Sequence, residues 1–476
     1  MKILLINQFP YYATGTEGTV YPPLGLAYIA SVLENAGYKN VRVLDANVLR
    51  LKNEEVIKKI VEYAPDIIGV SSNVVTQRAA IELCKIVKER FPEKLLVVGG
   101  PLPILHPEKF LKVSDVIVNG EGEVPFLEIV RAWESKSELK DIPGTASLHN
   151  EEIRINVRPE LIGDLDSIPF PAYHLMEPPL KEYSRKARIK KAYMAPILTS
   201  RGCPYQCTYC NKSVFGSTFR MRSAENVLGE IDWLMKNLNV KQIDVLDDNF
   251  NLNPERTNSI LDSIIDGRYD LAINCHNGLR VDRLTRELAG KLKRAGVFKV
   301  GVGVESGDER ILESVKKKLK LHMVRDVIKW FREENVVVHG YFIFGLPGDN
   351  GESMQNTINF AKKANPHFAN FAICIPFPGT VVYDYVKENG TFLKDVDNGV
   401  EAGFFDGTAF FEDDITIGEE VVAFNKKAFK SFYFRPSKVA DILFSIHSFS
   451  ELKWIISQVV SVLYNLFGKK LLRGRG

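Results

Sequence analysis

Three cysteines within eight residues form the part of this sequence best suited to chemistry. Cys203, Cys207 and Cys210 lie in the segment RGCPYQCTYCNK, three and then two residues apart. No secretory signal precedes them, so a tight cysteine cluster favours metal binding over a disulfide framework. Three thiolates can hold three irons of a 4Fe–4S cluster and leave the fourth iron open to a chelating small molecule. A zinc site and unrelated buried thiols are the alternatives, but structural zinc prefers four ligands.

The segment that follows the cysteines must position them, and it alternates short apolar runs with helical patterns. Six strand-like runs begin at about residue 191, namely APILTS, IDVLDD, LAINCH, FKVGVGVES, VVVHGYFIFG and FANFAICIP. Six βα units over residues 191–390 predict a partial (β/α)6 TIM-like barrel. In such a barrel the chemistry lies at the carboxyl ends of the strands.

The N-terminal region also alternates strand-like runs with helical patterns, but here the predicted fold is an open sheet and not a barrel. Residues 1–134 contain the strand-like runs KILLIN, VRVLDA, DIIGVSS, KLLVVGG and DVIVNGEGE between helical patterns. This α/β pattern predicts a doubly wound, Rossmann-like parallel sheet that binds a ligand at its strand ends. Residues 135–190 are rich in proline and are expected to be a linker. Residues 391–476 are expected to form a helical C-terminal region.

The cysteine spacing, with Tyr209 before the last cysteine, resembles the radical S-adenosylmethionine (SAM) superfamily over residues 191–390. The resemblance implies a 4Fe–4S cluster on the three cysteines and reductive cleavage of SAM to a 5′-deoxyadenosyl radical. It also implies SAM contacts at the ends of the second, fourth and fifth barrel strands, at Asp247, Asp248, Glu305, Ile343 and Gly345. The family's usual Gly-Gly-Glu is absent at the second strand, so which residue there contacts the methionine amine stays open.

Each of these secondary matches has a plainer structural explanation. Asp247 and Asp248 are equally typical of a helix N-cap or of solvated strand ends. Glu305 could pair with Arg310 in an ordinary surface contact. It is their order along the chain, each at a strand end, that favours the SAM-binding interpretation.

The N-terminal sheet resembles the cobalamin-binding domain of cobalamin-dependent radical SAM enzymes, on PPLGLAYIASVLENAGY, IIGVSSNVV, VVGG and VNGEGE. That resemblance implies cobalamin contacts from small or polar residues after the strands, at Ser71, Asn73, Gly99, Gly100, Gly120 and Glu121. The Asp-x-His-x-x-Gly signature of other cobalamin proteins is missing. We therefore expect no lower axial histidine, with the loop at Ser72–Val74 facing the cobalt. The alternative is a cobalamin-like fold that has lost its cofactor.

The charge balance and the hydropathy pattern indicate which classes of binding partner to expect. Lys+Arg (62) and Asp+Glu (59) nearly cancel, so no nucleic-acid partner is indicated. We expect a small-molecule substrate and an electron donor such as flavodoxin or ferredoxin. The absence of a signal peptide predicts a cytoplasmic protein. Residues 448–476 read as an amphipathic helix with a basic end, which is compatible with peripheral contact to an anionic membrane at its inner face. A helix docked on the barrel is the favoured interpretation.

The leading functional hypothesis is a cobalamin-dependent radical SAM enzyme, in the subgroup of the anaerobic Mg-protoporphyrin monomethyl ester cyclase-like proteins. Methyl transfer to an unactivated carbon is the expected reaction, and the catalytic residues stay unassigned. Radical oxidation or ring closure without methyl transfer is the alternative chemistry. A non-catalytic cobalamin and iron–sulfur sensor is the alternative from another class. A tRNA modifier is disfavoured because the sequence lacks extra cysteines and a basic C-terminal module.

The C-terminal region contains four phenylalanines that weakly favour an apolar substrate, namely Phe404, Phe405, Phe410 and Phe411. Packing of these side chains in the core is the alternative explanation.

Overall fold

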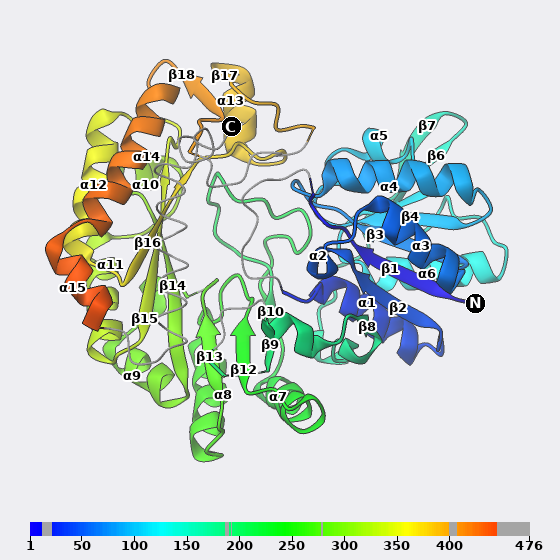
Figure 1. The fold of residues 1–476 in the computed structure, drawn as a ribbon, viewed down its shortest axis with the longest axis horizontal. Helices are drawn as coiled ribbons and strands as arrows, with labels where there is room; N and C mark the ends of the chain where they lie inside the picture. The colour runs from blue at the N-terminus through cyan, green and yellow to red at the C-terminus, as the bar shows by residue number, and fades with distance from the viewer. Residues whose placement is uncertain (12–20, 186–189, 192, 278, 399–406, 445–476) are drawn as a thin grey trace, which may run out of the picture. The chain divides into compact units, whose positions relative to one another are not determined.

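The computed structural model describes residues 1–11, 21–185, 190–191, 193–277, 279–398 and 407–444. Its contacts divide the chain into two compact units (Figure 1). The first contains residues 1–204, 212–244 and 397–401, and the second contains residues 205–211, 245–396 and 402–476. Among the described residues, no helix combines the length and apolar character needed to cross a membrane.

The first unit is built on an eight-stranded sheet of order β7-β6-β5-β4-β3-β1-β2-β8. Five parallel strands form its centre, and they match the predicted doubly wound pattern: β1 (Ile3–Asn7), β2 (Val41–Asp45), β3 (Ile67–Ser71), β4 (Leu95–Gly99) and β5 (Val116–Val118). The connecting helices are α1 (Leu24–Asn35), α2 (Ala46–Leu49), α3 (Asn53–Tyr63), α4 (Gln77–Arg90), α5 (Pro107–Phe110) and α6 (Glu123–Glu134).

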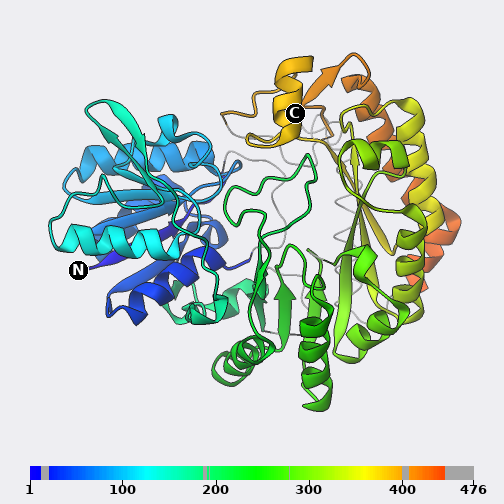
Figure 2. The ribbon, with the colours of Figure 1, turned by 180° about the vertical axis from the view of Figure 1, so that it is seen from behind.

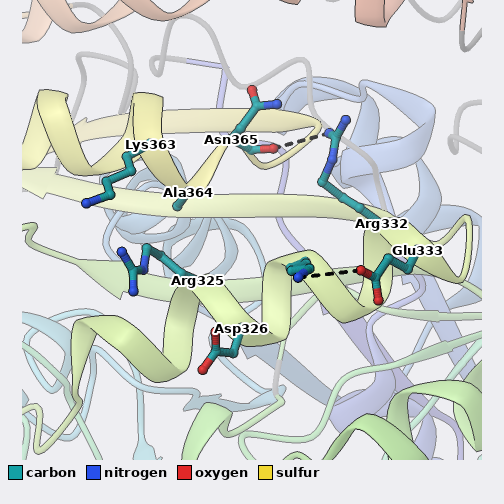
Figure 3. A pocket seen from close by; sticks show the side chains of 8 residues that line it. Arg325, Asp326, Arg332, Glu333, Lys363, Ala364 and Asn365 are labelled. Atoms are coloured by element: carbon teal, nitrogen blue, oxygen red, sulfur yellow. Dashed lines mark hydrogen bonds and ion pairs between the residues drawn. The ribbon is translucent and has the colours of Figure 1, made fainter.

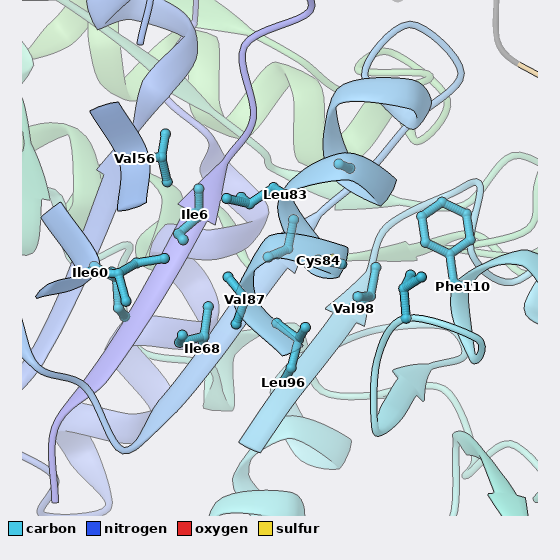
Figure 4. Close-up of a cluster of buried hydrophobic side chains, with 14 of the residues drawn as sticks. Ile6, Val56, Ile60, Ile68, Leu83, Cys84, Val87, Leu96, Val98 and Phe110 are labelled. Carbon is cyan, nitrogen blue, oxygen red and sulfur yellow. The ribbon is translucent and has the colours of Figure 1, made fainter. Parts of the chain in front are cut away.

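Alternate strand residues face opposite sides of this sheet, and each side is covered by helices. Leu4 and Ile6 of β1 pack with side chains from α3 and α4, including the buried Cys84 (Figure 4). On the other face, a side chain at Gly69 would collide with Leu5 and with Phe126 of α6. A sheet buried on both faces needs continuous apolar strands, which explains runs such as ILLIN and LLVVG.

The proline-rich stretch expected to be a linker contributes three strands to the same sheet. Strands β6 (Thr145–His149) and β7 (Glu152–Ile155) form a hairpin in which β6 pairs antiparallel with β5, and β8 (Met176–Glu177) pairs parallel with β2. Asn150 and Glu151 make the two-residue turn with positive φ angles of 48° and 67°. Such turns favour tight hairpins. The prolines mark the loops around these strands.

The second sheet has six strands in chain order, as expected for a partial barrel. They are β9 (Met194–Ile197), β12 (Gln242–Val245), β13 (Ala272–Cys275), β14 (Val297–Glu305), β15 (Val337–Phe344) and β16 (Phe368–Ile373). Strands β13 to β16 are parallel, and their register shifts at Ile273/Asn274 and at Gly303/Glu305. The helices between the strands are α7 (Ala224–Leu238), α8 (Pro254–Asp266), α9 (Arg286–Arg294), α10 (Glu309–Ser314), α11 (Leu321–Glu333) and α12 (Gly351–Ala364).

The C-terminal region docks on the last barrel strand. It comprises α13 (Val381–Asn389), the hairpin of β17 (Gly390–Phe392) and β18 (Phe411–Asp413), α14 (Gly418–Tyr433) and α15 (Pro436–Phe444). Helices α11, α12 and α14 cover one face of β14 to β16 (Figure 2). The Tyr433 hydroxyl donates to the Ala369 carbonyl at 2.7 Å and so ties α14 to β16. Phe410 and Phe411 are buried in the core, whereas Phe404, Phe405 and the expected membrane-contact helix lie outside the described residues.

Candidate functional site

The loop that carries the three cysteines begins at a short strand. Strand β10 (Ser200–Arg201) pairs with β11 (Arg220–Met221), and the chain leaves β10 through Gly202. Gly202 has a φ of 82°, and a side chain there would collide with the carbonyl of Thr218. Only glycine fits this turn without strain. Gly202 therefore directs the chain into Cys203.

The remainder of the cysteine loop is held by backbone hydrogen bonds in the second unit. The Thr208 amide donates to the Val315 carbonyl at 3.1 Å, and the Thr208 carbonyl accepts from the Val382 amide at 3.1 Å. The Cys207 sulfur lies 3.9 Å from the Lys316 carbonyl oxygen. The loop is thus fixed between the end of α10 and the start of α13.

The donor chemistry of this loop fits an iron–sulfur cluster. No described cysteine forms a disulfide, Cys203 and Cys207 are half-buried, and Cys210 is exposed. As they stand, no three His, Cys, Asp or Glu side chains of the described chain are close enough to hold a metal ion. The fit therefore rests on the three thiol donors and on the loop that presents them.

Tyr209 connects the cysteine loop to the predicted SAM-side residue Ile343. Both side chains pack against one buried cluster that includes Ile311, Val315 and Leu346. Burial is the main cause that raises the pKa of Tyr209, and the nearby Glu305, Cys207 and Cys210 raise it further. Tyr209 therefore stays a neutral phenol beside the cysteines.

Glu305 ends β14 in a conformation that carries strain. Its φ is 66°, in the left-handed region that non-glycine residues seldom adopt. Its side chain is 10% exposed, and its carboxylate forms a 2.7 Å ion pair with Lys317. A side chain at Gly303 would meet both partners, so this glycine leaves room for the pair. Arg310 pairs instead with Asp308 at 3.1 Å, so the alternative Glu305–Arg310 contact is wrong.

Asp247 and Asp248 follow β12 but have different environments. Asp247 is fully buried, and its carboxylate lies 4.0 Å from the Arg256 guanidinium. Asp248 is exposed. The N-cap of α8 is Asn253, whose side chain accepts from the Arg256 amide, so neither aspartate caps that helix. Burial of Asp247 beside an arginine also argues against simple solvation of this strand end.

Gly345 follows β15 in a turn held by a buried carboxylate. Its φ is 73°, and its amide donates to Asp349 at 3.0 Å. Burial raises the pKa of Asp349 to about 6, although hydrogen bonds from Ser353 and Gly345 oppose the shift. A side chain at Gly345 would press against Val421 of α14. The backbone at this predicted SAM contact is therefore rigidly placed.

On the cobalamin side, the predicted residues gather at the ends of β3 and β4. Ser71 and Gly99 are cross-strand neighbours. Gly100 has a φ of 105°, and a side chain there would lie 2.5 Å from the Ser72 carbonyl oxygen. Asn73 accepts from the amides of Val75 and Thr76 and shapes the following turn. Gly100 is therefore required by the close approach of the Ser72 backbone within the protein.

The Ser72 side chain shows whether this strand edge has an unsatisfied polar group that a ligand could pair with. Its hydroxyl is buried and has no hydrogen-bond partner among the described residues. Such an orphan costs about 1–3 kcal/mol unless something else satisfies it. A polar ligand over the β3–β4 edge would do so, which fits the predicted cobalamin site.

Glu121 has partners that the sequence does not reveal. Its carboxylate accepts from Arg201 at 2.8 Å and from Arg220 at 2.8 Å. Arg201 also donates to Glu123 at 2.6 Å, and all four side chains are buried. This network links the end of β5 to the strand that leads into Cys203. Cobalamin contact by Glu121 stays a prediction, and so does contact by Gly120, whose φ is 119°.

The remaining candidate features have structural explanations. Burial and Lys299 lower the pKa of His276 to about 4, so its imidazole is neutral at physiological pH. The His339 ring packs against Phe368 in a tilted arrangement, with ring centroids 4.9 Å apart. An open groove of about 590 Å³ lies between α11 and α12, lined by residues such as Arg325, Lys329 and Lys363 (Figure 3). It includes none of the predicted site residues.

Comparison with known proteins identifies two matching families along the chain. Residues 197–361 match the radical SAM superfamily, and residues 13–130 match the B12-binding domain. The chain belongs to the radical SAM enzymes that carry an N-terminal B12-binding domain. Its cofactors are accordingly a 4Fe–4S cluster, SAM and cobalamin, and the hypothesis of a non-catalytic sensor falls.

Individual relatives show how far the likeness extends. The chain is 32% identical over 464 residues to an uncharacterized methyltransferase of Pyrococcus horikoshii, covering 94% of this chain and 96% of that protein. It is 26% identical to an anaerobic magnesium-protoporphyrin IX monomethyl ester cyclase of Cereibacter sphaeroides, covering 82% and 64%. The cobalamin-dependent SAM radical enzyme OxsB with bound aqua-cobalamin has the same fold, with a TM-score of 0.77 at 17% identity over 98% of this chain and 72% of that one.

Proposed function

We propose that this enzyme cleaves SAM reductively and transfers a methyl group to an unactivated carbon of a small molecule. The observation that carries this proposal is the likeness to a methyltransferase at 32% identity over nearly the whole of both chains. When bound, the cluster would supply the electron that cleaves SAM, and cobalamin would supply the methyl carrier. The chain's own residues must hold, orient and shield these groups.

In this proposal the thiolates of Cys203, Cys207 and Cys210 hold the cluster. Glu305, kept in place by Lys317 at 2.7 Å, contacts SAM from the end of β14. Asp247 or Asp248 contacts SAM from the end of β12. Ile343 and Gly345 contact it after β15, where Ile343 shares a buried cluster with Tyr209. These roles are supported by the strand-end positions and by the strained backbone at Glu305.

The cobalamin contacts that we propose come from the carboxyl ends of the first sheet. Ser71, Asn73, Gly99, Gly100 and Gly120 would approach the cofactor with small side chains or backbone. The Ser72–Val74 loop would face the cobalt, since no axial histidine motif follows β1. The orphaned Ser72 hydroxyl supports this placement, because a bound ligand would satisfy it.

A second candidate reaction is radical oxidation or ring closure without methyl transfer. The likeness to a magnesium-protoporphyrin monomethyl ester cyclase favours it, at lower identity and over 64% of that protein. Either reaction needs an electron donor, for which we propose a flavodoxin or a ferredoxin, and neither needs a nucleic acid. We keep a cytoplasmic location as a prediction, with contact at the inner membrane face as the alternative for the C-terminal helix.

Label transfer distinguishes the two reactions. The reconstituted enzyme with hydroxocobalamin is incubated anaerobically with methyl-deuterated SAM and titanium(III) citrate, and the products are followed by mass spectrometry. Methyl transfer predicts S-adenosylhomocysteine, deuterated methyl on the corrinoid and 5′-deoxyadenosine. The cyclase-like reaction predicts 5′-deoxyadenosine without the other two. A Cys203→Ala/Cys207→Ala/Cys210→Ala variant should form no 5′-deoxyadenosine, and formation of this product by the variant would refute both reactions.

A further inference from the structure

A lysine-rich loop separates α10 from α11, and its side chains alternate in direction. This lysine loop has the sequence KKKLK at residues 316–320. Lys317 turns inward to pair with Glu305, and Leu319 is buried. Lys316, Lys318 and Lys320 are exposed. The structure therefore presents three ammonium groups from one short loop.

The conformation of the lysine loop is well defined. Lys316 and Lys318 have left-handed φ angles of 55° and 48°. The Lys317 amide donates to the Leu312 carbonyl at 2.9 Å, which closes the turn at the end of α10. The backbone angles and this hydrogen bond give the chain a defined turn after α10.

The lysine loop contacts the loop that carries two of the cluster cysteines. The Thr208 amide donates to the Val315 carbonyl at 3.1 Å, and the Cys207 sulfur lies 3.9 Å from the Lys316 carbonyl oxygen. Cys210 of the same loop is exposed. Positive charge at the surface thus borders the place where an electron must reach the cluster.

These three charges are not neutralised within the described chain. Lys316, Lys318 and Lys320 form no ion pair with a described acidic side chain, whereas Lys317 in the same loop does. Glu313 of α10 is exposed nearby and offsets part of the charge. A patch of this sign attracts an acidic protein and raises the rate of its association.

We propose that the lysine loop is the docking surface for an acidic one-electron carrier protein of the flavodoxin class. The inference rests on the proposed function, because it requires a cluster on Cys203, Cys207 and Cys210. In the complex, flavodoxin hydroquinone gives one electron to the oxidised cluster and becomes the semiquinone. That electron is used to break a carbon–sulfur bond of SAM, which yields methionine and the 5′-deoxyadenosyl radical.

The test compares two variants with the same change in charge. Lys318→Glu/Lys320→Glu reverses the docking surface and spares Lys316, whose carbonyl contacts Cys207. Lys329→Glu/Lys363→Glu reverses two exposed lysines of the α11–α12 groove and serves as the control (Figure 3). Binding of dye-labelled acidic flavodoxin is measured by fluorescence anisotropy at several salt concentrations. Formation of 5′-deoxyadenosine is measured with reduced flavodoxin and, separately, with titanium(III) citrate.

We expect Lys318→Glu/Lys320→Glu to weaken flavodoxin binding about tenfold or more and to flatten its salt dependence. Flavodoxin-driven turnover should fall with binding, while titanium-driven turnover and iron content stay as in the wild type. The control variant should match the wild type in every assay. Equal flavodoxin affinity in both variants, or no binding to the wild-type enzyme, would overturn the proposal. Binding to RNA and to anionic vesicles is measured in the same way. The proposal would also be overturned if Lys318→Glu/Lys320→Glu weakened binding to RNA or to vesicles but not to flavodoxin. Failure of the proposed function would give a different result from failure of the docking proposal. In that case the wild-type enzyme would form no 5′-deoxyadenosine even with titanium(III) citrate.

Discussion

Removing Arg201 should damage this protein far more than removing an exposed arginine that makes an equally short ion pair. Arg201 donates to Glu121 at 2.8 Å and to Glu123 at 2.6 Å, and its side chain is 3% exposed. Burial lowers the pKa of Arg201, but the carboxylates of Glu123 and Glu121 outweigh that effect and raise the pKa overall. The arginine is therefore charged, and it donates hydrogen bonds to both carboxylates.

The magnitude follows from what each partner loses in Arg201→Met. Glu121 keeps Arg220 at 2.8 Å, but Glu123 loses its partner while its side chain is only 7% exposed. Breaking a buried pair in this way costs about 3–5 kcal/mol, because a buried charge is left without compensation. The matched control is Arg131→Met, which breaks a 2.8 Å pair to Glu128 whose side chains are 56% and 44% exposed. That loss should cost at most about 1 kcal/mol.

Hydrogen exchange gives the stability of the first unit separately, which matters because a chain with two compact units need not unfold in one step. Opening free energies are taken from peptides of β4 and α6 in urea. Arg201→Met should lower them by about 3–5 kcal/mol. Arg201→Met/Glu123→Gln should recover at least half of the loss, since the uncompensated charge is gone. A cost no larger than that of Arg131→Met, or no recovery in the double variant, would refute the assignment.

Three further outcomes are expected. Gly100→Ala introduces about 1–3 kcal/mol of strain against Ser72 and should reduce the cobalamin retained after desalting while iron content is unchanged; full retention would contradict the placement. Glu305→Gln removes the charge paired with Lys317 and should weaken SAM binding by calorimetry about tenfold, the effect of losing about 1.4 kcal/mol, whereas unchanged affinity would remove Glu305 from the site. The folded-state pKa of Asp349 is about 6, above its ordinary value, so its stabilising effect is present at low pH and is lost as the pH rises through 6. Lowering the pH from 7 to 5 should thus stabilise the wild type by about 1 kcal/mol relative to Asp349→Asn, and parallel pH profiles would contradict the shift.

The strands and their ends could be read from the sequence because parallel βα units repeat a strong local pattern. The run VVVHGYFIFG contains the whole of the observed β15 (Val337–Phe344), and FKVGVGVES contains all of β14 (Val297–Glu305) except its first residue. Strand ends then place Glu305 and Gly345 at one edge of the sheet, without knowledge of the tertiary structure. The three cysteines are equally visible, since their spacing is local.

Partners that are distant in the chain could not be predicted. Glu121 pairs with arginines 80 and 99 positions away, and no local signal selects Arg201 and Arg220 from the other basic residues. Lys317 was hidden in a run of lysines that looks uniformly solvated. The sheet strands β6 to β8 were missed because prolines around them dominated the local pattern. Gly202 could have been found, since a glycine directly before a metal-binding cysteine often marks a turn.

The most direct test of the central claim is absorption spectroscopy and iron analysis of the enzyme reconstituted anaerobically with iron, sulfide and hydroxocobalamin, beside the Cys203→Ala/Cys207→Ala/Cys210→Ala variant. The claim predicts that cobalamin bands survive desalting in both proteins, while iron and the broad iron–sulfur absorbance are retained only by the wild type. That result would establish two cofactors bound by separate sets of residues. Cobalamin that washes off completely while the cluster persists would contradict the cobalamin assignment, and with it the proposed methyl transfer.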